Sequence, residues 1–147
     1  METKPVILKP SDRKVALNVV GVQITILASE GVIQDQQITI QSGAEGVGPP
    51  PHSHDWDETF YVIKGQVEFV CGGEVATCPV GTLVHVPAGT VHAFSFGAGG
   101  GEMFEFTGKG SNAAAMFSAV DRQIPPGPLD LKKAIDVLAE NGVTVHL

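Results

Sequence analysis

Residues 49–66 read PPPHSHDWDETFYVIKGQ, and they place two of the chain's five histidines one residue apart. Side chains at positions i and i+2 of a β-strand project to the same face, so His52 and His54 are expected to lie side by side. Glu58 returns to that face if the strand stays regular, and the preceding prolines stiffen its entry. The stretch therefore predicts three metal-binding types of side chain converging from one ribbon.

A second stretch, GTLVHVPAGTVHAF at residues 81–94, supplies a fourth candidate ligand. Its segment 87–90 is typical of a turn, and His92 opens the strand that follows. If that strand lies beside the first, His92 completes a set of three histidines and one carboxylate. Such a set fills four positions of an octahedral metal and leaves two adjacent positions open for substrate or oxygen. A closed four-ligand site would be structural.

Alternation of apolar and polar residues dominates the chain up to about residue 107. Short alternating runs separated by glycine and proline turns are typical of an all-β sandwich or barrel, here over about residues 15–107. The expected strands are residues 22–26, 36–41, 58–64, 66–71, 74–78, 82–86, 91–96 and 102–107. The glycine-rich residues 97–101 are expected to form the loop between the last two strands.

The periodicity changes after the last expected strand, which predicts a C-terminal helical segment over residues 111–141. Ser111 is expected to cap a short helix over residues 113–117. Residues 129–140 form an amphipathic pattern that must dock on the barrel or on a partner subunit. Its expected apolar stripe consists of Leu131, Ala134, Ile135 and Leu138. With no linker or repeat in the sequence, we expect one domain over residues 1–147.

Composition excludes several classes of function. The net charge is −7, and the only adjacent basic residues are Lys132 and Lys133, so we expect no nucleic-acid partner. No apolar run approaches the roughly 20 residues that span a bilayer, so we expect no membrane partner. The N-terminus lacks the apolar core of a signal peptide, which favours a cytoplasmic location. Only 17% of residues are charged, which favours some apolar surface buried between subunits.

These two stretches resemble the motifs of the cupin superfamily. The first motif is matched at Gly46, His52, His54, Glu58 and Gly65, and the second at Gly81, Pro87, Gly89 and His92. The second motif often ends in asparagine, where this chain has Phe96. The short spacing between the motifs looks like that of small single-domain cupins, most similar to quercetin dioxygenase-like members. The resemblance implies a double-stranded β-helix, the jelly-roll or cupin barrel.

The resemblance also implies one divalent transition metal at the centre of the barrel, held by His52, His54, Glu58 and His92. The sequence does not distinguish Fe, Mn, Ni, Cu, Co and Zn. Some relatives use the glutamate as a base, so Glu58 is either a ligand or a proton-transfer group and is the candidate catalytic residue. Small cupins usually dimerise, which implies a homodimer.

Aromatic side chains are expected to wall the pocket beside the metal. Phe94 and Phe96 share the strand face of His92, and Phe60 shares that of Glu58. Trp56 lies between the ligands, at the expected mouth, and Phe104 and Phe106 are expected to join the interior from the last strand. The predicted pocket residues are therefore Trp56, Phe60, Phe94 and Phe96. Such a pocket suits a small apolar or planar partner molecule that chelates metal.

The predicted function is a metal-dependent dioxygenase acting on a small enol, diketone or phenolic compound. One alternative is a non-catalytic cupin that binds or senses a small molecule. Another is a non-redox metal-dependent isomerase, decarboxylase or hydrolase. Because the fold hosts all of these, the site has to decide among them.

Overall fold

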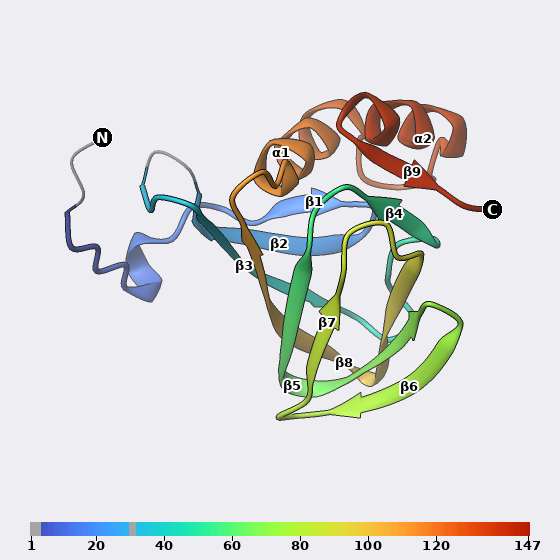
Figure 1. The fold of residues 1–147 in the computed structure, drawn as a ribbon, viewed down its shortest axis with the longest axis horizontal. Coiled ribbons are helices and arrows are strands. Elements are labelled where there is room, and N and C mark those ends of the chain that lie inside the picture. Colours follow the sequence, from blue (N-terminus) through green and yellow to red (C-terminus); the bar gives the residue numbers. More distant parts are fainter. Residues whose placement is uncertain (1–3, 30–31) are drawn as a thin grey trace.

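An antiparallel β-sheet curls into a half-barrel, and two helices cover one end of it (Figure 1). The computed structural model describes residues 4–29 and 32–147. Its elements are a 3₁₀ turn at Pro10–Asp12, β1 (Leu17–Val19), β2 (Val22–Ala28), β3 (Gln36–Gly43), β4 (His52–His54), β5 (Glu58–Cys71), β6 (Glu74–Pro79), β7 (Leu83–Val86), β8 (His92–Gly108), α1 (Ala113–Gln123), α2 (Leu131–Glu140) and β9 (Val143–Val145). This confirms the all-β barrel with a C-terminal helical segment.

The strand order explains how distant parts of the chain meet. One path of paired strands runs β1-β2-β3-β8-β4-β9, and β5 joins it through β8 while carrying β6 and β7. All these pairs are antiparallel, and β5 and β8 form a ladder that runs from Glu58 opposite Thr107 to Cys71 opposite His92. Apolar side chains of both strands fill the interior, including Phe60 and Phe69 of β5 and Met103 of β8. The ladder therefore brings residues from the two sequence motifs together.

The glycine-rich residues 97–101 form no loop, contrary to the prediction. They lie inside β8, where they bulge away from β5: Gly65 stands opposite Gly101, and Val67 stands opposite Phe96. One residue of β5, Gln66, therefore lies opposite four residues of β8, at positions 97–100. The predicted break at Gly65 is also wrong, because β5 continues through it. Since β5 pairs with β8 on both sides of the bulge, the glycines form a corner at which β8 bends without ending.

The helices differ from the prediction in length and in buried face. Helix α1 continues to Gln123. Its N-cap residue is Asn112 and not Ser111 as predicted, although Ser111 Oγ accepts from the Ala113 N–H at 3.0 Å. Helix α2 packs on α1 and β9 and buries Ala134, Val137 and Leu138. Of the predicted apolar stripe, Ile135 is only half-buried and Leu131 is exposed. Within the described residues, no helix is long and apolar enough to cross a membrane.

The sequence analysis missed strand β9, which follows α2 and pairs with the histidine strand β4. His52 lies opposite Val145, and His54 lies opposite Val143. The backbone N–H of His146 adds a hydrogen bond to the Pro51 carbonyl at 2.8 Å. The C-terminal segment is thereby tied to the strand that carries two of the candidate ligands.

Because β5 and β8 approach closely at the corner, we expect a small substitution at Gly65 to lower the stability of the protein strongly. Gly65 has φ +65°, and a Cβ there would lie 2.1 Å from the Gly100 carbonyl oxygen. In Gly65→Ala, we expect the free energy of unfolding to fall by about 1–2 kcal/mol for the backbone conformation and by about 1–3 kcal/mol more for the clash. Denaturant unfolding measures this loss.

Gly73→Ala is the matched control, because Gly73 has φ +84° and nothing lies within 4 Å of its added Cβ. Only the backbone cost, about 1–2 kcal/mol, is expected there. Equal losses in the two variants would contradict the close approach of β5 and β8 at the corner.

Candidate metal centre

Four candidate ligands from three strands meet at one end of the barrel. His52 and His54 lie on β4, Glu58 begins β5, and His92 begins β8. One ligand atom from each of the four lies within 4.8 Å of all the others. The pairing of β4 with β8 sets His52 directly opposite His92 and brings their ring centroids to 4.2 Å. The four residues can therefore hold one metal ion.

Backbone carbonyl groups fix the orientation of all three imidazole rings. In each histidine, Nδ1–H donates to a carbonyl oxygen two residues away. The contacts are His52 to Pro50 (2.8 Å), His54 to Trp56 (3.0 Å) and His92 to Thr90 (2.9 Å). A ring whose Nδ1 carries the proton keeps an unprotonated Nε2, which is the form that binds metals.

The Nε2 atoms meet the carboxylate of Glu58. His54 Nε2 and His92 Nε2 lie 3.1 and 3.0 Å from Glu58 Oε1. Two lone pairs facing a carboxylate oxygen repel one another unless a proton or a cation lies between them. Imidazole nitrogens and one carboxylate are the ligands of a divalent transition metal. The residues present therefore fit such an ion.

The buried surroundings shift the pKa values of these groups. Burial, followed by the charge of His92, lowers the pKa of His52 to about 4, so this imidazole is neutral at pH 7. Burial alone would raise the pKa of Glu58, but the hydrogen-bonding contacts with Glu105, His54 and His92 outweigh it and hold that pKa well below its ordinary value. Glu58 is thus an ionised carboxylate in a buried site.

Glu105 is a buried residue that the sequence analysis missed. It projects inward from β8 and is 1% exposed, whereas Phe104 is half-buried and Phe106 is exposed, contrary to the expectation that both face inward. The bulge at residues 97–100 shifts the alternation of β8, so that odd-numbered residues point inward after it and even-numbered ones before it. The register of a bulge cannot be read from alternation alone.

Glu105 and Glu58 form a carboxyl–carboxylate pair. Thr39 Oγ1–H donates to Glu105 Oε1 at 3.1 Å, and Glu105 Oε2 has no donor among the described residues. Burial, followed by the negative charge of Glu58, raises the pKa of Glu105 well above its ordinary value. Glu105 therefore keeps its proton and donates it in a hydrogen bond to Glu58, because two neighbouring buried carboxyl groups do not both ionise.

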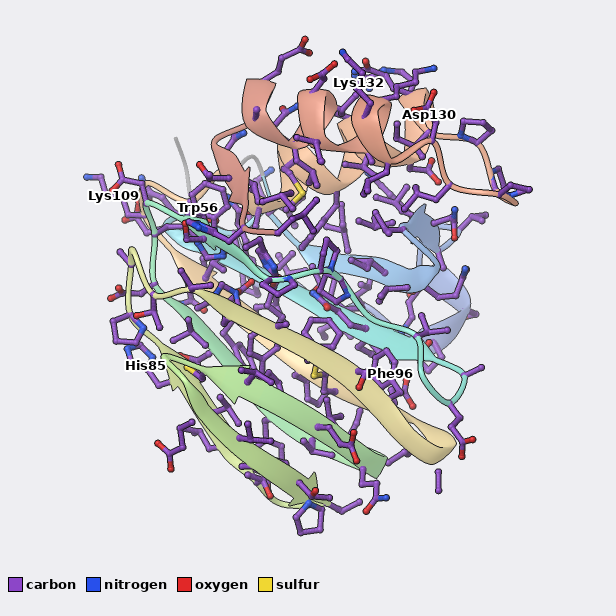
Figure 2. The ribbon with its side chains drawn as sticks, turned by 90° about the vertical axis from the view of Figure 1, so that its right-hand side faces the viewer. Trp56, His85, Phe96, Lys109, Asp130 and Lys132 are labelled. Atoms are coloured by element: carbon purple, nitrogen blue, oxygen red, sulfur yellow. The ribbon has the colours of Figure 1, made fainter. Side chains whose placement is uncertain are left out.

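A cavity of about 60 Å³ lies beside three of the four residues. Phe60 and Phe94 line it, and so do His52, His54 and Glu58. Trp56 and Phe96 are buried but are not among the described residues that line it. Trp56 stacks on the His54 ring with centroids 4.3 Å apart, and Figure 2 shows Phe96 farther from the helical layer than Trp56.

The remaining histidines lie outside this centre. His85 is exposed, and its Nδ1 lies 2.9 Å from Thr59 Oγ1. His146 is also exposed, with Nε2 at 2.7 Å from Ser53 Oγ.

The carboxyl pair predicts how metal affinity responds to substitution at Glu105. The amide of Glu105→Gln can still donate to Glu58 and accept from Thr39, so we expect zinc affinity within about threefold of wild type. Glu105→Leu has no donor, and loss of such a supporting contact typically weakens metal binding by about 10–100-fold. Competition with a chelating dye measures both affinities. Equal affinities in the two variants would show that Glu105 only fills space.

Comparisons with known proteins agree with this geometry. Residues 37–104 match the family model described as the cupin domain. No curated protein matches the chain. KdgF from a Halomonas species aligns at TM-score 0.66 and 18% identity, over 74% of this chain and 99% of its own.

Other solved structures share the fold. An RmlC-like cupin from Shewanella frigidimarina aligns at TM-score 0.63 and 15% identity, over 74% of this chain and 94% of its own. The polyketide cyclase RemF from Streptomyces resistomycificus aligns at TM-score 0.62 and 18% identity, over 71% of this chain and 80% of its own. The protein therefore has the fold of a small cupin, and its residues 37–104 are similar to the cupin domain.

Proposed function

We propose that this protein is a metal-dependent dioxygenase of the quercetin dioxygenase-like kind, acting on a small enol, diketone or phenolic compound. One observation carries the proposal: three imidazoles, each held by a backbone carbonyl, converge with the ionised Glu58 beside a largely apolar cavity. A bound transition metal would supply Lewis-acid chemistry and, if redox-active, electron transfer to a chelating oxygen compound.

The chain's own residues have separate roles in this proposal. His52, His54, His92 and Glu58 hold the ion, and Glu58 is also the carboxylate placed to take a proton from a bound hydroxyl group. The apolar walls, including Phe60 and Phe94, exclude water from the reacting centre. No lysine or arginine is among the described residues that line the cavity, which favours a substrate without a phosphate group.

A non-redox reaction is the second candidate, and the pair of Glu58 and Glu105 favours it. One ionised and one protonated carboxyl group side by side are the parts needed to move a proton between two positions of a substrate. Structures with the same fold include a polyketide cyclase and DMSP lyases, whose names describe a cyclase and a lyase reaction and not an oxygenation. On this proposal the same site acts as an isomerase, lyase or cyclase without oxygen.

Metal content and oxygen uptake test the proposed function. Wild type purified without chelators is expected to contain about one transition-metal ion per chain and to consume oxygen with small enols, diketones or phenols. In His52→Ala/His54→Ala, we expect metal content to fall at least tenfold with the barrel still folded, because two of four ligands are gone. His85→Ala, outside the site, is the control.

Turnover of the same compounds under anaerobic conditions, or with zinc, would replace dioxygenation with the non-redox reaction. Full metal content in the double variant would overturn the assignment of the ligands. Stoichiometric metal without turnover of any compound would indicate the binding role instead.

We also propose that two copies associate through the outer face of the sheet. Tyr61, Leu83 and Phe104 are cross-strand neighbours on β5, β7 and β8, with Phe106 beside them. Tyr61 is 41% exposed, Leu83 62% and Phe106 39%. The outer face of an antiparallel sheet is ordinarily polar. Because this patch carries no charged residue, a second copy can face it across a twofold axis without repulsion.

Charges on that face are expected to separate the copies. Tyr61→Lys/Phe106→Lys should be a monomer in sedimentation velocity, while wild type should be a dimer. Val75→Lys is the matched control, since Val75 is 73% exposed on β6, outside the patch, and should leave the dimer intact. A monomeric wild type, or a dimer that survives the double substitution, would contradict this interface.

A further inference from the structure

The cavity beside the candidate metal centre has two chemically different ends. His52, His54 and Glu58 form one end, and Gln41 and Glu105 add further polar groups there. The rest of the wall is apolar and comes largely from outside the cupin domain at residues 37–104. Its main members are Val20 of the β1–β2 turn, Met116 and Phe117 of α1, Leu138 of α2, and Val143 and Val145 of β9. A bound molecule therefore meets polar groups at one end and hydrocarbon at the other.

The apolar end is built from fixed parts. Phe117 and Leu138 are buried at 5% and 8% exposure, and both belong to the main core cluster. Strand β9 pairs with β4, the strand that carries His52 and His54. The His146 N–H also donates a hydrogen bond to the Pro51 carbonyl. In Figure 1 the helices lie across the end of the barrel with β9 beside β4. This wall is thus part of the packed core and limits the space beside the ligands.

Val20 narrows the same end at a conformational cost. It has φ 51°, in the left-handed region that a β-branched residue rarely adopts. The hairpin turn it forms with Gly21 favours asparagine or glycine at this position. Its side chain nevertheless packs on the core and lines the cavity. A strained valine at a cavity wall is consistent with a role in shaping the cavity.

The size of the cavity limits what fits. Its volume is about 60 Å³. A dry apolar cavity on the order of 150 Å³ is what takes up benzene. A phenyl ring therefore does not fit wholly between the ligands and this wall, whereas a methyl or a short alkyl group does.

We propose that the substrate is a short aliphatic oxygen chelator and that Val20, Phe117 and Leu138 exclude aromatic ones. This rests on the proposed function for the chelating head and narrows its substrate class from enols, diketones and phenols to small aliphatic enols and diketones. The polar end receives the oxygen atoms, and the apolar end receives no more than a few carbons.

Two hydroxamic acids with the same chelating head and different tails test this on the zinc-loaded protein. By calorimetry, wild type is expected to bind acetohydroxamate at least tenfold more tightly than benzohydroxamate. Phe117→Ala removes a ring from the wall and is expected to bring benzohydroxamate within threefold of acetohydroxamate. Zinc content is measured after each titration, to show that the hydroxamate has not removed the ion.

Val120→Ala is the matched control, because Val120 is equally buried on α1 but does not line the cavity. It should keep the wild-type preference. If Phe117→Ala does not fold, Leu138→Ala opens the same end from α2. Tight binding of benzohydroxamate by wild type, or an unchanged preference in the variants that line the cavity, would overturn the proposal.

A metal-free measurement separates this proposal from the metal assignment. The methyl signal of Met116 is followed by NMR during titration with 1-propanol and with benzyl alcohol. In wild type, propanol should shift it saturably and benzyl alcohol should not, whereas Phe117→Ala should respond to both. An equal response of wild type to both alcohols would overturn the size limit. Failure to bind zinc would overturn the proposed function and leave this result standing.

Discussion

The hydrogen bond from each imidazole Nδ1–H to a backbone carbonyl is the contact on which the candidate centre depends. Each acceptor lies two residues from its histidine: Pro50 before His52, Trp56 after His54 and Thr90 before His92. The direction of each Nε2 is therefore set by the local backbone around a strand end. The prolines before β4 and the turn at 87–90 before β8 limit that backbone's conformations. The pairing of β4 with β8 then brings imidazole rings of already fixed orientation close together.

A buried carboxylate is the main electrostatic cost of this arrangement, and neighbouring strands offset it. Glu58 on β5 faces the Nε2 atoms of two histidines and accepts a hydrogen bond from Glu105, which is in turn held by Thr39 on β3. The long ladder between β5 and β8 is what keeps the two carboxyl groups together, since Phe60, two residues after Glu58, pairs with Glu105. A bound cation would further stabilise the ionised form of Glu58. Fold, charge and candidate chemistry are thus coupled through one pair of strands.

The sequence predicted the parts of the fold and site that follow from alternation and spacing. It predicted the β class, the C-terminal helices, and the approach of His52, His54, Glu58 and His92. It did not predict the features that depend on breaks in alternation. The bulge at residues 97–100 changes which residues of β8 face inward. Alternation alone therefore missed buried Glu105 and wrongly placed Phe104 and Phe106 in the interior. Nor did it predict β9 or the cavity wall built by α1 and α2, because long-range docking leaves little trace in local periodicity. Inward-facing Phe96 was predicted from its strand parity, but its absence from the cavity wall depends on packing across the barrel.

The central claim is that three imidazoles and one carboxylate bind one metal ion. X-ray absorption spectroscopy of the zinc-loaded protein tests it most directly, because the spectrum counts histidine ligands around the ion. The account predicts three imidazole nitrogens and carboxylate oxygen in wild type, and two imidazoles in His54→Ala. A zinc environment without histidine, or an unchanged count in His54→Ala, would contradict it.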